Sequence, residues 1–293
     1  MIATTIRSLF IATLLAPFAV AQNLPVKWEE LTAADFVKAI EQANGVCLLP
    51  FGVIEKHGPS GPLGTDLINV RYASVSAAQQ EYAVVFPEYY FGQIFEAMHQ
   101  PGTIAYSARL QLELLQETTA EMARNGCTKV VIVNGHGGNT HLTRYFTQTQ
   151  IDKPKDYVVY AIMGGGRPEN PPPEAAASGP GVDGHAGEGE TANVMASRPD
   201  LVHTDRGGSE SGADLNRLDL PSNVETAIWW YARFPNHYAG NASGATAERG
   251  KALMQMRIDA IANAVRAIKS DQISPRLQKE FFEQVTHPLD TLK

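Results

Sequence analysis

Apolar runs of strand length alternate with helical segments along most of this chain. The run VCLLPFGV is rich in β-branched residues near its ends and is closed by Gly and Pro, as expected of one buried strand. Strands and helices that alternate in this way predict an α/β fold, with a mostly parallel sheet and helices on both faces of a single layered domain. The expected strands cover residues 46–53, 83–88, 129–133 and 157–163.

Capping residues and glycines mark where helices begin and end. Thr32 or Asp35 can cap a first helix, which Gly45 stops. Ser107 caps a long helix that closes at Gly126. The segment AIWWYARF is open to two interpretations, a strand or an aromatic-lined helix turn. Other helices are expected over 67–82, 140–150 and 251–270, the last of which is expected to finish the chain.

The first 21 residues have the features of a secretory leader. Arg7 precedes a short apolar run, and Ala19 and Ala21 flank Val20 in the small-x-small pattern of a cleavage site. An N-terminal membrane anchor is the alternative, but the run is short for a span and contains Pro17. We expect cleavage after Ala21 and a mature domain, residues 22–293, that is periplasmic or secreted and not held by a membrane.

Composition excludes some functions and leaves the cysteines open. A net charge of −7 and the lack of a basic run argue against a nucleic-acid partner. Cys47 and Cys127 lie at or near the starts of expected strands. An oxidising compartment would allow them to pair. We favour the alternative, that both are small apolar side chains in the core.

The segment PFGVIEKHGPSGPLGTD places three ionisable side chains within one glycine-broken turn of chain. Glu55 and His57 are two apart after the first expected strand, so they point the same way. Gly and Pro residues then bend the chain and can return Asp66 to the same point. Oxygen and nitrogen donors at a strand end suit a metal site. A salt-bridged loop without a metal is the alternative.

A second focal segment, TKVVIVNGHGGN, ends a strand in a glycine-rich turn that contains His136. The glycines let backbone approach a ligand closely, and the carboxyl ends of strands are where open α/β sheets place ligands. The turn alone could cradle a phosphate, but the Gly-Lys-Ser/Thr pattern of phosphate loops is missing. Because a histidine between glycines has little room for a core role, we interpret His136 as functional.

The third focal segment, DGHAGEGETANVMASRPDLV, supplies His185, Glu188 and Glu190 just before an expected short helix. Either glutamate could simply favour the helix N-terminus through its dipole, and one of the two is expected to do only that. Among the other histidines, His99 could close a pocket wall and His141 could pack on its helix. We expect His203, His237 and His287 to face solvent. The loop of residues 164–184 is long enough to be a lid or a subunit contact.

The residues of these three segments, taken together, permit hydrolysis by a pair of metal ions. Mixed oxygen and nitrogen donors without Cys suit zinc or manganese, with iron a further option. A water that bridges two such ions is acidified enough to attack as hydroxide. His185 is then free to carry the proton to the leaving nitrogen. The candidate ligands are Glu55, His57, Asp66, His136 and a carboxylate from Glu188 or Glu190.

Several of these motifs, in this order and spacing, resemble the creatininase family of metal-dependent amidohydrolases. They are LLPFGVIEKHGPSGPLGTD, HQPGTIAYS, VIVNGHGGN, HAGEGETANVMASRPDLV and GATAERGK, and they cover most of the mature chain. The resemblance implies a layered α/β fold, a two-metal centre, hydrolysis of a carbon–nitrogen amide bond and a homohexamer.

The same resemblance assigns roles to individual residues. It implies that Glu55 and His136 bind one metal, His57 binds the other, Asp66 bridges them and His185 is the catalytic histidine.

Two departures from creatininase change these expectations. Gly138 stands where creatininase has a Glu ligand in NGHYEN, so Glu190 is our first choice for the missing donor. Glu188 is the second choice and a candidate catalytic carboxylate. Glycine also stands, near Gly164 and Gly181, where creatininase has tryptophans around creatinine. A small amide other than creatinine, such as a lactam or a formamide, is therefore the expected substrate.

Two other functions compete with an exported amidohydrolase. A non-catalytic protein could keep the fold and a metal for binding or assembly, although a binder would not need His185. A metal-dependent phosphoesterase could also use two metals. The negative net charge and the absence of an arginine near the motifs, apart from Arg144, weigh against a phosphoesterase.

Overall fold

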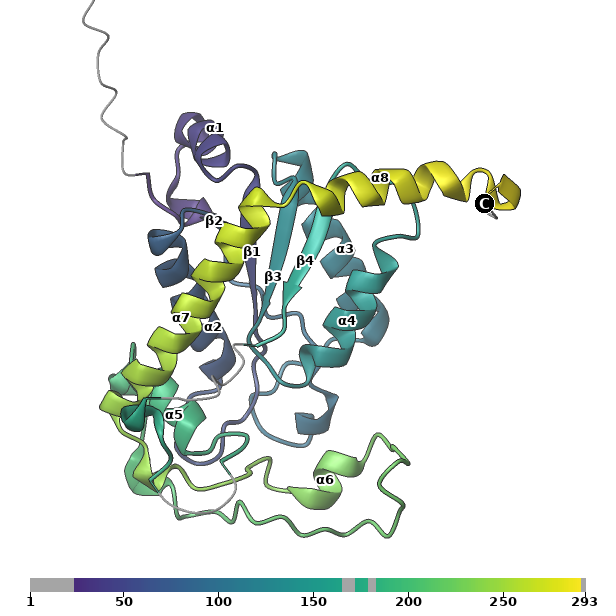
Figure 1. Cartoon of the computed structure of the whole chain (residues 1–293). Helices are drawn as coiled ribbons and strands as arrows, with labels where there is room; N and C mark the ends of the chain where they lie inside the picture. The colour runs from purple at the N-terminus through teal and green to yellow at the C-terminus, as the bar shows by residue number, and fades with distance from the viewer. Residues whose placement is uncertain (1–23, 165–171, 179–182, 291–293) are drawn as a thin grey trace, which may run out of the picture.

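A parallel sheet of four strands forms the centre of the molecule. The computed structural model describes residues 24–164, 172–178 and 183–290, so the expected leader lies outside it. The strand order is β2-β1-β3-β4, and every pairing is parallel (Figure 1). This confirms the predicted fold class. The strands are β1 (Val46–Phe51), β2 (Val84–Val85), β3 (Lys129–Asn134) and β4 (Val158–Ile162).

Helices cover both faces of this sheet (Figure 1). On one face α2 and α7 pack together, and on the other face α1, α3 and α4 share a second core with the strands. Burial on both faces explains why the strands are mostly apolar, with Lys129 and Asn134 at the two ends of β3 as exceptions. The bounds are α1 (Ala33–Gln42), α2 (Thr65–Gln80), α3 (Ala108–Arg124), α4 (Asn139–Thr149) and α7 (Ala247–Ser270).

The side chains of strand β1 pack alternately in two hydrophobic cores. Val46 and Leu48 pack in the core beneath α2 and α7, whereas Leu49 and Phe51 pack in the core beneath α1, α3 and α4. The alternation follows from side chains that point to opposite faces of a strand. Residues Val46 to Phe51 pair in register with Lys129 to Asn134 of β3, so the two strands end side by side.

Caps predicted from the sequence are present at two helix starts and one helix end. The Thr32 hydroxyl accepts a hydrogen bond from the backbone N–H of Asp35, and the Ser107 hydroxyl accepts one from Leu110. Gly45 ends the first helix with φ of +70°, a conformation that favours glycine.

The preference for unpaired cysteines is wrong, because Cys47 and Cys127 form a disulfide. Cys47 lies near the start of β1, and Cys127 lies two residues before the neighbouring strand β3. Their Cα atoms are 5.7 Å apart, within the range that a disulfide spans.

Other differences concern helix bounds near the carboxyl end of the chain. The undecided aromatic segment forms α6 (Trp229–Arg233). Helix α5 (Glu188–Met195) begins earlier than predicted, so Glu188 and Glu190 lie inside its first turn. The prediction that the chain finishes with residues 251–270 is also wrong, because α8 (Ile273–Val285) follows α7 and projects from the body (Figure 1).

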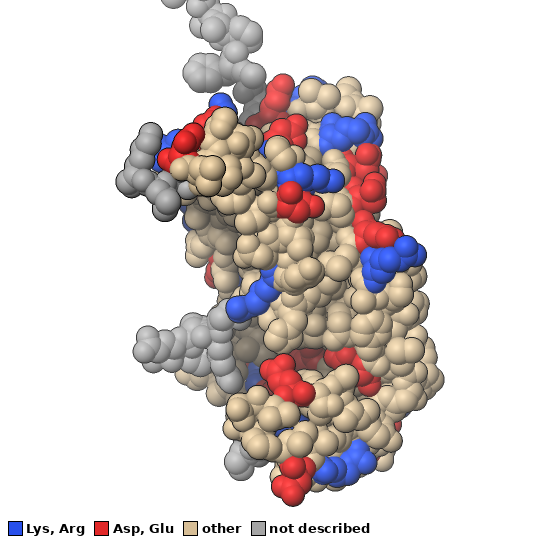
Figure 2. All heavy atoms as spheres, turned by 90° about the vertical axis from the view of Figure 1, so that its right-hand side faces the viewer, with Lys and Arg blue, Asp and Glu red and all other residues tan. Residues whose placement is uncertain are grey.

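Charge is mixed on the surface that Figure 2 shows. Lys and Arg are scattered among Asp and Glu on this face, and acidic side chains lie at a hollow in its lower part. In the part of the chain that the structure describes, every helix is too short or too polar to span a bilayer.

Candidate metal centre

The predicted ligands meet where β1 and β3 end. Glu55 and His57 follow β1, His136 follows β3, and Asp66 lies in the first turn of α2. All four side chains are buried. Gly52 allows this turn to approach the strand, because a Cβ there would lie 2.8 Å from the backbone nitrogen of Leu67. The glycine-rich loop therefore returns Asp66 to the strand ends, as the sequence predicts.

One group of ligand-type atoms surrounds the His136 ring. The Nδ1 atom of His136 lies 2.9 Å from Glu55 Oε1 and 2.9 Å from Asp66 Oδ2. A second group surrounds His57, whose Nε2 atom lies 3.5 Å from Asp66 Oδ1 and 3.7 Å from Glu190 Oε2. The two oxygens of Asp66 therefore face two different histidines, and Glu55 Oε1 lies near both rings, 3.9 Å from His57 Nε2.

Hydrogen bonding fixes which nitrogen of His57 faces the carboxylates. Its Nδ1 lies 3.2 Å from the backbone carbonyl of Glu55, and a carbonyl can only accept. The proton of the neutral ring is therefore on Nδ1, which leaves the Nε2 lone pair directed at Asp66 and Glu190. A carbonyl that holds the second nitrogen in this way is typical of metal-ligating histidines.

The residues present fit a divalent cation. Glu55 Oε1, His57 Nε2 and Asp66 Oδ2 are buried and make no hydrogen bond within the described residues. These three residues lie close together: one ligand atom from each is within 4.8 Å of a ligand atom from each of the other two. Buried polar atoms without hydrogen bonds are costly, and a metal ion would satisfy them.

Charge coupling within the cluster shifts its pKa values. Burial alone would lower the pKa of His57, but Asp66, Glu190 and Glu55 raise it to about 10. Burial also opposes the charged form of His136. Glu55 and Asp66 outweigh it and hold the pKa of His136 well above its ordinary value. The pKa of Glu55 lies well below its ordinary value, because nearby histidines outweigh its burial. Without an ion, protons on the histidines balance the carboxylates, and a cation would replace those protons.

His185 lies beside the second group, with its ring centroid 4.6 Å from that of His57. Its Nε2 donates to the Lys56 carbonyl at 2.9 Å, which leaves Nδ1 as the acceptor of the neutral ring. That Nδ1 atom is 3.6 Å from Glu190 Oε2. The ring also lines the larger of two cavities at the site, so it is accessible from that cavity.

The expectation that His237 faces solvent is wrong. His237 is buried, and its Nδ1 accepts a hydrogen bond of 2.9 Å from the indole N–H of Trp230. Because an indole only donates, the proton of His237 is on Nε2, which donates to Glu55 Oε2. Burial lowers the pKa of His237, in keeping with a neutral ring. Trp230 and His237 thus hold Glu55 with its other oxygen toward His136.

Glu188 does not join the predicted ligands. Its carboxylate pairs with Arg249 at 2.8 Å and accepts hydrogen bonds from the backbone and hydroxyl of Ser178. Glu190, two residues on, instead approaches His57 and His185. The geometry therefore favours Glu190 over Glu188 as the ligand from α5.

Gly138 leaves room for the carboxylate of Glu96, which is not among the predicted ligands. A Cβ at this position would lie 2.5 Å from His136 Nε2 and 2.9 Å from Glu96 Oε1. Both groups thus face the space that the missing Glu side chain would enter. Only a glycine at 138 admits them without displacement.

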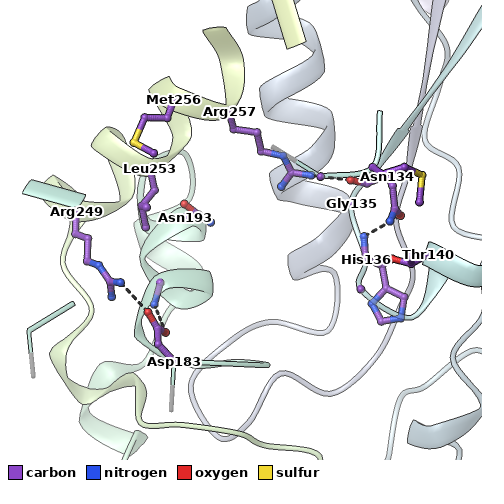
Figure 3. Close-up of a pocket in the computed structure, with 14 residues that line it drawn as sticks. Asn134, Gly135, His136, Thr140, Asp183, Asn193, Arg249, Leu253, Met256 and Arg257 are labelled. Carbon is purple, nitrogen blue, oxygen red and sulfur yellow. Dashed lines mark hydrogen bonds and ion pairs between the residues drawn. The ribbon is translucent and has the colours of Figure 1, made fainter. Parts of the chain in front are cut away.

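Two cavities open beside these residues. The larger, of about 1590 Å³, is bordered by Glu55, His136, His185 and the helix α6, including Trp229 and Tyr231. The smaller, of about 400 Å³, lies between α7 and the end of β3 (Figure 3). Arg249 and Arg257 line it, so the expectation that arginine is absent near the motifs is wrong.

The fold and the site define an α/β protein with a His and carboxylate centre of the kind that binds metals, placed at strand ends. Residues 29–265 match the family described as creatininase, creatinine amidohydrolase. The chain therefore belongs to the creatininase family of amidohydrolases and is an enzyme, a hydrolase.

Individual relatives are distant in sequence but cover most of the chain. The chain is 28% identical to a mycofactocin precursor peptide peptidase of Mycobacterium ulcerans (strain Agy99), over 72% of this chain and 81% of that protein. It is 24% identical to a creatinine amidohydrolase of Pseudomonas putida, over 81% of this chain and 95% of that protein. A solved structure titled "Creatininase Mn" has the same fold, with a TM-score of 0.69, 21% identity and coverage of 85% and 100%.

Proposed function

We propose that this chain is an exported amidohydrolase that uses two divalent ions to hydrolyse the amide bond of a small molecule. The observation that carries this proposal is the position of Asp66, whose Oδ2 faces His136 and whose Oδ1 faces His57. Glu55 and His136 would hold one ion with Asp66. His57, Glu190 and the other Asp66 oxygen would hold the second.

The donor set favours zinc or manganese, with iron a further option, because it combines imidazoles and carboxylates without a thiolate. The similar solved structure named "Creatininase Mn" supports this choice. When bound, such ions polarise an amide carbonyl and make water a nucleophile at neutral pH.

The protein's own residues would orient the reaction and move its proton. His185 is held by the Lys56 carbonyl, so its Nδ1 atom is available to take a proton and deliver it to the leaving nitrogen. Two successive hydrogen bonds, from Trp230 to His237 and from His237 to Glu55, hold the Glu55 carboxylate in place. The aromatic side chains Trp229, Trp230 and Tyr231 of α6 line the larger cavity and would offer an apolar surface to a substrate.

A non-catalytic role in metal or ligand binding is the alternative, and an activity screen separates the two. Protein with measured metal content would be assayed on lactams, formamides, linear amides and a phosphate ester. We expect amide hydrolysis that chelation removes and that His185→Ala lowers by about 10²-fold or more. Unchanged hydrolysis in His185→Ala would contradict the proton-transfer role. Hydrolysis of the phosphate ester alone would contradict the reaction class.

Export is proposed from the leader pattern and supported by the disulfide, because such bonds persist in oxidising compartments. N-terminal sequencing of the periplasmic or secreted protein should find Gln22 first. A chain recovered only from the cytoplasm and still beginning at Met1 would contradict this.

We also propose that the chain forms a homo-oligomer, a hexamer as the family resemblance implies. Along α8 the apolar side chains Ile273, Leu277, Phe281 and Val285 are exposed at helical spacing, and exposed apolar faces of this kind are typical of contact surfaces. Light scattering at micromolar concentration should therefore give a mass well above the 31.8 kDa of one chain. A monomer mass would contradict the proposal.

A further inference from the structure

Arg257 lies in the wall between the two cavities, and the protein uses little of its hydrogen-bonding capacity. Its Nη2 donates to the Asn134 carbonyl at 3.0 Å, as Figure 3 shows. Within the described ranges this is the only hydrogen bond of its guanidinium, and no carboxylate oxygen there lies within 4.0 Å. A guanidinium has five N–H donors, so most of them remain available to a ligand.

Arg249, on the same helix, shows what a structural arginine looks like here. Arg249 is 5% exposed and pairs with Asp183 at 2.7 Å and with Glu188 at 2.8 Å. Those two carboxylates neutralise it and tie α5 to α7. Arg257 has no such partner, although both arginines line the smaller cavity (Figure 3).

The position of Arg257 connects it to the candidate metal centre. It borders both cavities together with Gly135, His136 and Asn193. Its partner Asn134 is two residues before His136, and Asp66 and Glu190 are close enough to act on its charge. A ligand at His136 can therefore reach the guanidinium.

The larger cavity offers a different surface to the rest of such a ligand. The apolar side chains Phe95, Met98, Ile228, Trp229 and Tyr231 line it and are 40% to 65% exposed. Exposed apolar groups that gather in one cavity mark a site for an apolar ligand.

We propose that Arg257 binds the carboxylate of the substrate, and that the substrate is an N-acyl amino acid whose apolar part occupies the larger cavity. This inference rests on the proposed amide hydrolysis. A planar guanidinium matches a carboxylate in geometry and charge. Arg257 is a single cation, and Asp66 and Glu190 already act on its charge, so the site suits a monoanion better than a phosphate dianion.

The test compares two substrates that differ only in the carboxylate, N-benzoyl-leucine and N-benzoyl-3-methylbutylamine. Wild-type protein should prefer the acid by about 10- to 100-fold in kcat/KM, because a hydrogen bond to a charged group has about that value. Arg257→Gln should bring the ratio near one, and Arg257→Lys should restore part of it. Arg266→Gln, a surface change on the same helix, should leave the ratio unchanged.

Two results separate failure of this inference from failure of the proposed function. Hydrolysis of both amides at equal kcat/KM by the wild type would overturn the role of Arg257 and leave the reaction intact. If neither amide is hydrolysed, calorimetry on metal-free protein decides. Binding of N-benzoyl-leucine that Arg257→Gln weakens at least about 10-fold would support the carboxylate site. Equal binding of N-benzoyl-leucine and N-benzoyl-3-methylbutylamine would overturn it.

Discussion

At the scale of single residues, the site depends on hydrogen bonds that select one nitrogen of each histidine. The Glu55 carbonyl fixes His57, the Lys56 carbonyl fixes His185, and the Trp230 indole fixes His237. In each case a group that can only accept or only donate determines the tautomer of the neutral ring. The rings are thereby oriented before any ligand binds, which lowers the cost of binding an ion.

Removal of His237 should weaken metal binding although His237 need not touch the ion. His237→Ala leaves Glu55 Oε2 without its donor, and the loss of such an outer partner typically costs about 10- to 100-fold in metal affinity. Competition with a chromophoric chelator measures the dissociation constant. His287→Ala, which removes an exposed histidine, is the matched control. Equal affinities of His237→Ala and wild type would show that Glu55 does not need this contact.

Metal binding should release protons from His57 at neutral and mildly alkaline pH. The folded, ion-free chain holds the pKa of His57 at about 10, above the ordinary 6.5. Charged His57 therefore stabilises the ion-free fold fully below about pH 6.5, and this stabilisation is lost as the pH rises through about 10.

Calorimetry of metal binding at pH 8, in two buffers of different ionisation enthalpy, counts the released protons. We expect about one proton or more per chain and fewer in His57→Gln. Release of no proton by the wild type would contradict the assignment of a charged His57 to the ion-free state.

At the scale of elements, the sequence predicts a helix or strand well when the residues that determine it lie close together in the sequence. Continuous apolar runs and caps identify β1 and α1 because both signals lie within a few residues. The five residues of α6 are too few for periodicity to separate helix from strand. Helix α8 lies beyond the last helix that the sequence predicts, and Pro275 occupies its first turn, where proline is tolerated.

The disulfide also depends on a non-local contact, since it follows from β1 and β3 being neighbours in the sheet. It closes a loop of 80 residues, so its removal by Cys47→Ala with Cys127→Ala should lower the free energy of unfolding by about 2–5 kcal/mol. Urea unfolding measures this. Metal affinity should not change, because Cys47 is near the start of β1 and the ligands follow its end. Loss of metal affinity in the double variant would contradict that separation.

At the scale of the whole molecule, strand order brings distant segments to one edge of the sheet. Four of the five predicted ligands come from motifs at strand ends or in the first turn after them, which is why the sequence indicates them. His237 follows α6 in a loop without periodicity, 182 positions from its partner Glu55. Arg257 faces the cavities only because α7 packs on the sheet. Neither residue has a local sequence signal, so only the assembled fold identifies them.

The metal content of purified protein tests the central claim most directly. After equilibrium dialysis against Zn²⁺ or Mn²⁺, inductively coupled plasma mass spectrometry should find about two ions per chain, because the two oxygens of Asp66 face two different histidines. Asp66→Ala, which removes the carboxylate that faces both histidines, should hold neither ion tightly. A wild-type content of one ion or none per chain would contradict the account.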